Sequence, residues 1–159
     1  MPVHIEEASP ADAAAIAALS SDVQKLHSDA YPWRFKQPVD DKAFTEELAV
    51  LLQNPNYFAY LARDHDAPVG YILAEIIRRP ETRRLFAHEM IYVHHMSVRP
   101  RSQRKGIGGS LLDACKAKGR SLGISMLALD TWSFNDPALA FFRKSGLTPL
   151  SVRLSGKID

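Results

Sequence analysis

Hydrophobic and polar positions follow two different periods along the chain, which predicts a mixture of helices and strands. Apolar residues recur at helical spacing in residues 9–30 and 40–52, so each segment is expected to form a helix with one apolar face. Residues 3–8, ahead of the first helix, form a short run typical of a strand. The chain is therefore expected to begin with a strand followed by two helices.

The middle of the chain is richer in aromatic and β-branched residues. Residues 57–62, 69–77 and 89–98 form three such runs, and polar turns separate them. This arrangement predicts three antiparallel strands joined as a meander. Helical spacing returns in residues 108–122, directly after the third strand.

The last third of the chain repeats the alternation of strand and helix. Residues 124–129 are expected to form a strand, and Asp136 with Pro137 marks the start of a helix that ends at Gly146. Residues 147–154 are expected to return as a last strand. We find no repeat or linker, so residues 1–159 are interpreted as one α/β domain with a mixed sheet.

Composition narrows the class of protein further. With 46% hydrophobic and 24% charged residues the chain is typical of a globular protein. A formal charge of only +2 argues against nucleic-acid binding. The lone Cys115 has no internal disulfide partner, and no apolar run approaches the roughly 20 residues of a membrane span. The N-terminus lacks a signal-peptide pattern, so we expect a cytoplasmic protein without a membrane partner.

The chemically informative segment is a glycine-rich turn between the third meander strand and the following helix. Its glycines are Gly106, Gly108 and Gly109, and its basic residues are Arg101, Arg104 and Lys105. Free N–H groups at a helix N-terminus favour an anion, and glycines let the backbone approach it closely. The segment has neither the Walker nor the dinucleotide spacing. On the glycines alone, a tight turn without a ligand is an equal alternative.

The order of motifs resembles the GNAT superfamily of N-acetyltransferases. Residues 103–108, Gln-Arg-Lys-Gly-Ile-Gly, match that family's Gln/Arg-x-x-Gly-x-Gly/Ala signature, and a second similar segment follows at residues 127–135. The resemblance implies a mixed, mainly antiparallel sheet of about six to seven strands flanked by helices. It also implies an acetyl-coenzyme A-dependent N-acetyltransferase, in which an amine attacks the thioester directly within a ternary complex.

The resemblance also assigns residues to acetyl-coenzyme A. The expected contacts are Met96, Ser97, Val98, Gln103, Arg104, Lys105, Gly106, Ile107, Gly108, Gly109, Ser110, Asn135 and Phe142. The backbone of Met96 and Val98 would pair with the pantetheine arm, and an N–H near Val98 would stabilise the oxyanion. Asn135 would contact the same arm or, alternatively, cap the next helix. Phe142 departs from the family, in which a tyrosine often protonates the departing thiolate.

The general base is sought among His94, His95 and Glu89, with Glu75 as a further candidate. Strict alternation places the two histidines on opposite faces of their strand. The family's strand-four carboxylate, where present, falls near His94, so we favour His94. A bulge is usual in that strand of similar enzymes and would reverse the parity, so His95 stays open. Each histidine is alternatively a packed or surface residue.

The amine acceptor is not identified by the sequence. Tyr31, Trp33 and Phe35 are expected either to line an acceptor pocket or to cover the sheet. His and Cys spacing gives no metal site, so none is expected. A homodimer through the C-terminal strand is a candidate arrangement. Two alternative functions are a non-catalytic coenzyme A sensor and transfer from another acyl-coenzyme A.

Overall fold

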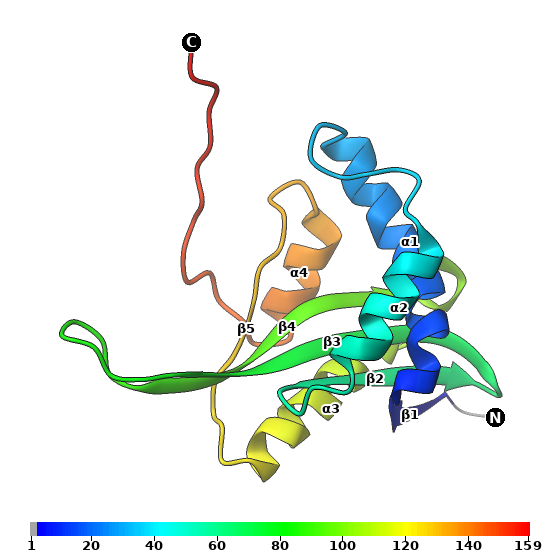
Figure 1. Cartoon of the computed structure of the whole chain (residues 1–159), viewed down its shortest axis with the longest axis horizontal. Coiled ribbons are helices and arrows are strands. Elements are labelled where there is room, and N and C mark those ends of the chain that lie inside the picture. The colour runs from blue at the N-terminus through cyan, green and yellow to red at the C-terminus, as the bar shows by residue number, and fades with distance from the viewer. Residues whose placement is uncertain (1–2) are drawn as a thin grey trace.

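Five strands in chain order form the sheet of the computed structural model, which describes residues 3–159 (Figure 1). The strands are β1 (His4–Glu7), β2 (Tyr57–Asp64), β3 (Ala67–Arg79), β4 (His88–Val98) and β5 (Leu127–Leu129). The helices are α1 (Ala13–Ala30), α2 (Asp41–Leu51), α3 (Ile107–Ser121) and α4 (Asp136–Lys144). The first four strands are antiparallel and β5 runs parallel to β4. The expected mixed, mainly antiparallel α/β fold is confirmed.

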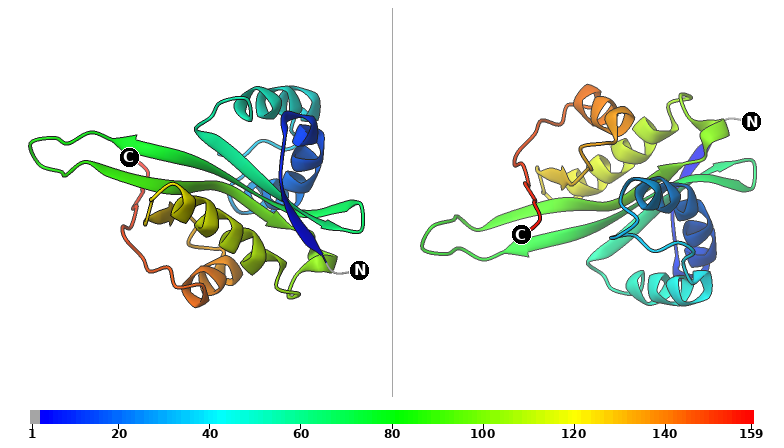
Figure 2. Two further views of the ribbon diagram at one scale, coloured as in Figure 1. Left: turned by 90° about the horizontal axis from the view of Figure 1, so that it is seen from below. Right: turned by 90° about the horizontal axis from the view of Figure 1, so that it is seen from above.

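Helices cover both faces of the sheet (Figure 2). Tyr71 and Leu73 of β3 lie in the core formed with α1 and α2, whereas Ile72 and Ala74 lie in the core formed with α3. Residues 71–74 are all buried, which explains why β3 is a continuous hydrophobic run rather than an alternating one. Within residues 3–159, no helix combines the length and the hydrophobicity needed to cross a membrane.

Helix α1 begins where the sequence indicates, with one difference in detail. The Ser9 N–H donates to Asp12 Oδ2 at 2.8 Å, as expected of a capping box. Pro10–Asp12 nevertheless form a 3₁₀ turn, and regular α-helix starts only at Ala13. Such turns are frequent at helix N-termini.

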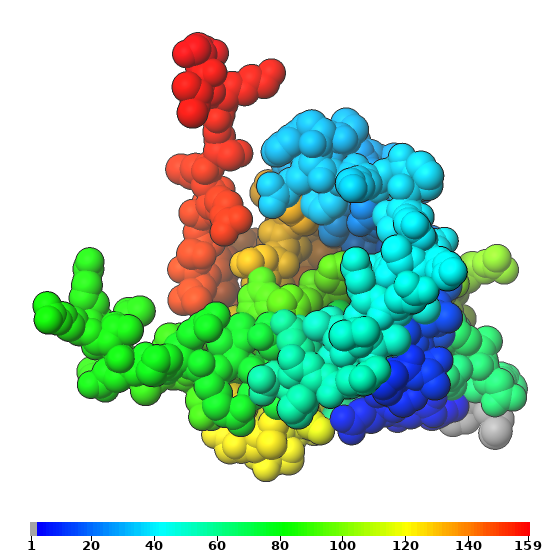
Figure 3. Space-filling model, viewed as in Figure 1, coloured from blue at the N-terminus to red at the C-terminus, as the bar shows by residue number. Residues whose placement is uncertain are grey.

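The strand expected at residues 147–154 does not form, so the sheet has five strands instead of six or seven. Leu147 still packs against the core, but residues 148–159 run extended away from the sheet, and Leu150, Val152 and Leu154 are all more than three-quarters exposed (Figure 3). The alternating apolar pattern correctly indicates an extended backbone. The pattern does not show which neighbouring strand would supply the hydrogen bonds of a further strand. The edge strand β5 has only three residues and offers a short edge for such pairing.

The core beneath α3 should dominate stability. Leu111 is 0% exposed and Leu150 is 93% exposed, so the same substitution tests burial alone. We expect Leu111→Ala to lower the free energy of unfolding by about 2–5 kcal/mol, because it leaves a cavity. Leu150→Ala should change it by less than about 0.5 kcal/mol. Urea denaturation measures both, and similar losses would contradict the assigned core.

Candidate functional site

Strands β4 and β5 separate halfway along β4. They pair only at Ile91 with Leu127, Tyr92 with Ala128 and Val93 with Leu129. Beyond Val93, β4 continues to Val98 beside β3 but without β5. This part of β4 therefore presents an open edge inside the molecule, next to the N-terminus of α3.

The backbone of this open edge is directed outward at alternate residues. The Arg99 N–H donates to Val69 O of the β3 segment at 2.8 Å. Because the hydrogen-bonding direction alternates along a strand, the N–H and C=O groups of Val98 and Met96 point away from β3. Gln103 Nε2 donates to Val98 O at 3.0 Å, which ties the turn to this edge. The neighbouring Ser97 side chain is buried.

The N-terminus of α3 lies at the end of the same edge. Gly106 has φ of 81°, and the first bond within the helix runs from the Ser110 N–H to Gly106 O. The N–H groups of Ile107, Gly108 and Gly109 thus have no acceptor within α3. A side chain added at Gly106 or Gly109 would meet no heavy atom within 4 Å. Free donors and open space are the features that suit a helix N-terminus to an anion.

The charges and the third glycine of this turn have separate roles. Arg101, Arg104 and Lys105 are all exposed and surround the helix N-terminus with positive charge. Gly108 instead permits close packing, since a Cβ there would lie 3.3 Å from both Met96 Cε and Phe141 Cζ. A substitution at Gly108 therefore disturbs the protein itself.

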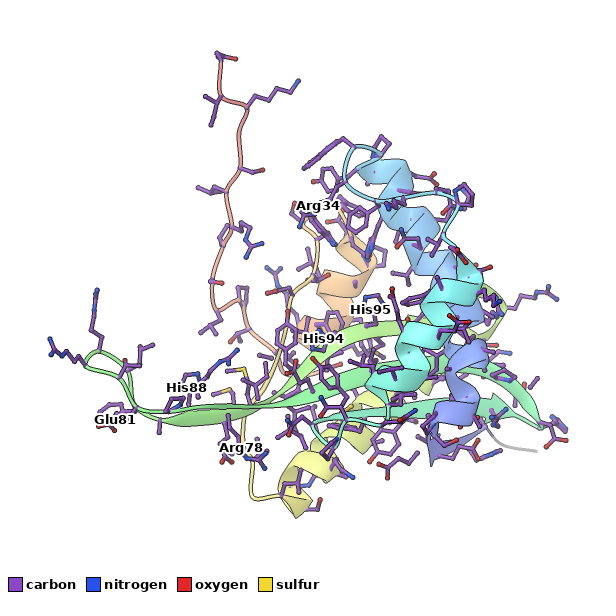
Figure 4. The ribbon with its side chains drawn as sticks, in the orientation of Figure 1. Arg34, Arg78, Glu81, His88, His94 and His95 are labelled. Atoms are coloured by element: carbon purple, nitrogen blue, oxygen red, sulfur yellow. The ribbon has the colours of Figure 1, made fainter. Side chains whose placement is uncertain are left out.

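A bulge in β4 decides where the two adjacent histidines lie. Leu73 faces His95 whereas Ala74 faces Val93, so His94 is the extra residue. The bulge brings His94 and His95 into one pocket on the α1 and α2 face (Figure 4). The expectation from strict alternation, that they occupy opposite faces, is therefore wrong. Counting alternate residues along the sequence cannot reveal an inserted residue, which reverses the faces of the residues that follow it.

His94 is held by a carboxylate. Its Nε2 lies 2.7 Å from Glu75 Oε2, and the ring stacks on Tyr57 with centroids 5.7 Å apart. An ionised carboxylate only accepts hydrogen bonds, so Nε2 carries the hydrogen and Nδ1 keeps the lone pair of the neutral ring. Glu75, on the neighbouring strand, thereby fixes both the tautomer and the orientation of His94.

His95 lies beside Tyr71 in the same pocket. Its Nδ1 lies 3.4 Å from the hydroxyl oxygen of Tyr71, which is a long contact. Burial is the largest cause that lowers the pKa of His95, and the nearby His94 and His27 lower it further. Burial also raises the pKa of Tyr71. His95 is therefore a neutral imidazole at neutral pH.

The histidines form one wall of a pocket of about 310 Å³ between α2 and the sheet. Its lining residues are Ile16, Phe44, Glu47, Leu48, Leu51, Tyr57, Tyr71, Leu73, His94 and His95. The pocket thus lies on the face of the sheet opposite α3. Its two proton-accepting rings stand on β4, where that strand leaves β5.

The aromatic loop after α1 forms a cluster with the segment after β5. Tyr31 and Phe35 pack against Trp132 at centroid distances of 5.2 and 5.3 Å, and the Arg34 guanidinium lies 5.3 Å from the same ring. Trp33 is largely exposed. None of the three expected acceptor contacts, Tyr31, Trp33 and Phe35, is among the residues that line the pocket. Their contact with the acceptor stays a prediction.

Glu89 is not brought together with the histidines. It lies five residues before His94, about 17 Å along an extended strand. Its Oε1 is 3.3 Å from Arg78 Nε on the projecting β3–β4 arm (Figure 4). Glu75 occupies the place beside His94 instead. The sequence named Glu75 as a further candidate, but the pairing across strands decided between the two.

Asn135 precedes α4 and Phe142 lies within it. Asn135 Oδ1 accepts the Ala138 N–H at 3.2 Å, so Asn135 caps the helix. A cap uses only the carbonyl oxygen of the amide, so the predicted pantetheine contact is compatible with it. Phe142 packs edge-on against Phe141 at 5.1 Å, and as a phenylalanine it offers no proton to a thiolate.

Two other chemistries find little support. Cys115 is fully buried, and burial raises the pKa of its thiol to about 12, so it is unreactive. Among residues 3–159, no three His, Cys, Asp or Glu side chains gather as a metal-binding group.

Comparisons with known proteins agree with this geometry. The model of the acetyltransferase (GNAT) family matches residues 20–147. A tetramutant of the BH1408 protein from Bacillus halodurans has a TM-score of 0.90 at 17% identity, over 98% of this chain and 99% of that one. A predicted acetyltransferase from Clostridium acetobutylicum, solved with acetyl-coenzyme A, gives 0.75 at 17% identity over 98% and 96%.

An aminoglycoside N-acetyltransferase, AAC(6')-Iy, solved with coenzyme A, gives a TM-score of 0.76 at 15% identity, over 99% of this chain and 95% of that one. At such low identities the structural likeness shows the fold alone. No curated protein matches the sequence significantly.

Two histidines with lowered pKa values should make the protein sensitive to acid. Burial lowers the pKa of both His27 and His95 in the folded state, while the unfolded chain keeps the usual value of about 6.5. Their contribution to stability is complete above that pH and is lost as the pH falls through the lowered folded values. We expect the free energy of unfolding in urea to fall from about pH 7 to pH 5.

His95→Gln should reduce this dependence, because glutamine does not titrate. His88→Gln is the matched control, since His88 lies on the β3–β4 arm and is not among the residues that line the pocket. Equal acid sensitivity in the wild type and both variants would contradict the role given to His95.

Proposed function

Because the chain belongs to the acetyltransferase (GNAT) family, we propose that it transfers the acetyl group of acetyl-coenzyme A to a primary amine. The observation that carries this proposal is the separation of β4 from β5. Beyond this separation β4 has an open edge that Gln103 ties to the turn before α3, and His94 and His95 of the same strand line the pocket. The family establishes acetyl transfer in general, whereas the amine and the mechanism are our proposal.

The donor would occupy the α3 side of the separation. Acetyl-coenzyme A supplies the activated acyl group as a thioester. The N–H groups of Ile107, Gly108 and Gly109 would hold its pyrophosphate, aided by the surrounding basic side chains. The outward N–H groups of Met96 and Val98 would hold the pantetheine arm as an added strand. An N–H near Val98 would stabilise the oxyanion.

His94 is the proposed general base. An ammonium group has no lone pair, so a proton must leave before the amine nitrogen attacks the thioester carbonyl. Nδ1 of His94 accepts this proton while Glu75 holds Nε2 and stabilises the imidazolium that forms. The neutral His95 lies beside it in the same pocket. No covalent intermediate on the enzyme is required.

The leaving thiolate needs no acid from the protein. Phe142 stands where many family members carry a tyrosine, and a phenyl ring donates no proton. A thiol has an ordinary pKa of about 8.5, so its thiolate is a tolerable leaving group and takes its proton from water. The same departure supports one rival function, a coenzyme A sensor without catalysis. That rival predicts ligand binding without release of coenzyme A from the acetyl form.

The anion site can be tested by reversing its charge. Gly109→Glu places a carboxylate in open space at the α3 N-terminus, where it would repel pyrophosphate. At about 100 times its dissociation constant, acetyl-coenzyme A should stabilise the wild type by roughly 2.7 kcal/mol. Thermal melts should show that shift in the wild type and lose it in the variant. Ala117→Glu, also exposed on α3, is the matched control and should keep the shift. A full shift in Gly109→Glu would refute the site.

The base can be tested by removing one proton acceptor at a time. We expect His94→Gln to lower kcat/KM for the amine by about 10²–10⁴-fold and Glu75→Gln to lower it less. Both variants should still be stabilised by acetyl-coenzyme A. His88→Gln on the arm is the control. Release of coenzyme A, followed across pH, gives the rates. If His94→Gln keeps its rate while His95→Gln loses it, the base is His95.

A further inference from the structure

We infer that the acceptor is a primary amine attached to one compact apolar group. This inference rests on the proposed acetyl transfer and assigns the pocket beside His94 and His95 as the acceptor site. The amine nitrogen would lie at the two histidines, and its apolar group would fill the space between α2 and the sheet.

The inner walls of the pocket are mainly apolar, and its polar groups belong to Glu47, the two histidines and two tyrosines. Helix α2 contributes Phe44, Leu48 and Leu51, and β3 contributes Leu73 together with the ring of Tyr71. Leu48, Tyr71 and Leu73 are each no more than 5% exposed, so the inner wall belongs to the core. An apolar group that enters is stabilised by about 25 cal/mol for each Å² removed from water. A hydroxyl group placed against these apolar side chains would lose its hydrogen bonds to water without replacement.

The charge around the pocket fits a single ammonium group. Glu47 is the one carboxylate among the residues that line it, and Glu75 is engaged by His94 just beside it. A carboxylate at the mouth attracts the protonated amine, and His94 then receives its proton. A polycation such as an aminoglycoside brings several ammonium groups and many hydroxyls. The single carboxylate of this lining cannot pair with all of the ammonium groups.

The size of the pocket limits the apolar group. A volume of about 310 Å³ lies at the lower end of the range for small-molecule sites. It suits an aryl or branched alkyl group, either in a free amine or as the first side chain of a peptide with a free N-terminus. Both sources present the same chemistry, a primary amine within a few bonds of one apolar group.

A panel of acceptors tests the inference. Coenzyme A release would be measured with 2-phenylethylamine, isopentylamine, a phenylalanyl dipeptide, spermidine and an aminoglycoside. We expect kcat/KM for 2-phenylethylamine or the dipeptide to exceed that for both polycations by at least about tenfold. Whichever of these two has the higher kcat/KM shows whether the acceptor is a free amine or the N-terminus of a peptide. If a polycation leads, the inference is wrong while the acetyl transfer stands. If no amine releases coenzyme A, both proposals fail.

Two pairs of variants tie the preference to the pocket. Leu51→Trp fills the pocket from α2, whereas Val50→Trp adds the same ring at an exposed neighbouring position. We expect Leu51→Trp to raise KM for 2-phenylethylamine by about tenfold or more and to leave KM for methylamine unchanged. Val50→Trp should change neither. A loss with both amines, or with neither, overturns the assignment; melting temperatures verify that the variants fold.

Glu47→Gln removes the charge at the mouth without touching the core, since Glu47 is exposed. Its KM for 2-phenylethylamine should rise severalfold and depend less on salt than that of the wild type. Glu46→Gln, on the same helix but outside the pocket, is the matched control. Equal KM values in the two variants would overturn the role of Glu47.

Discussion

The structure depends on the early separation of β4 from β5. Only three residue pairs join the two strands, and the remaining half of β4 keeps β3 on one side while its other edge is open. An open strand edge inside a protein must find other partners for its N–H and C=O groups. Here Gln103 reaches back to Val98 O, and the N-terminus of α3 ends beside the same edge. A thioester with an amide-rich arm is a natural partner for such an edge.

The sheet also lies between the proposed binding regions of the acetyl donor and the amine acceptor. The α3 face carries the donors for an anion, and the α1 and α2 face carries the apolar pocket. A bulge in β4 turns both histidines to the second face, where Glu75 on β3 fixes the tautomer of His94. The donor and the acceptor are thus expected to approach β4 from opposite faces of the sheet. They would meet beyond Val93, where β4 no longer pairs with β5.

The aromatic loop closes the end of the molecule beyond this meeting point. Tyr31 and Phe35 join α1 to the segment after β5 through Trp132, and Trp132 also carries the Arg34 guanidinium on its face. His27 belongs to the same cluster and helps to lower the pKa of His95. Tyr31 and Phe35 are therefore packed against the segment after β5 and do not line the pocket.

The sequence by itself determined most of the helices and strands and located the glycine-rich turn of residues 106–109. Helical and strand periodicity, the Ser9 and Asp12 box and the glycines of residues 106–109 act over a few neighbouring positions, so their consequences can be read locally. These features predicted the α/β class and the order of strands and helices as far as α4, whereas the cofactor role of the glycine turn stays a prediction.

Tertiary structure alone decided how distant segments meet. In the folded chain His94 forms a bulge and contacts Glu75, which is 19 residues away in the sequence. The residues that line the pocket come from two helices and three strands. Tertiary structure also left the alternating residues 150–154 without a sheet partner. The physical reason is the same in each case. Local pattern sets backbone conformation and the face of a side chain, whereas register, bulges and cavities depend on the packing of residues far apart in the chain.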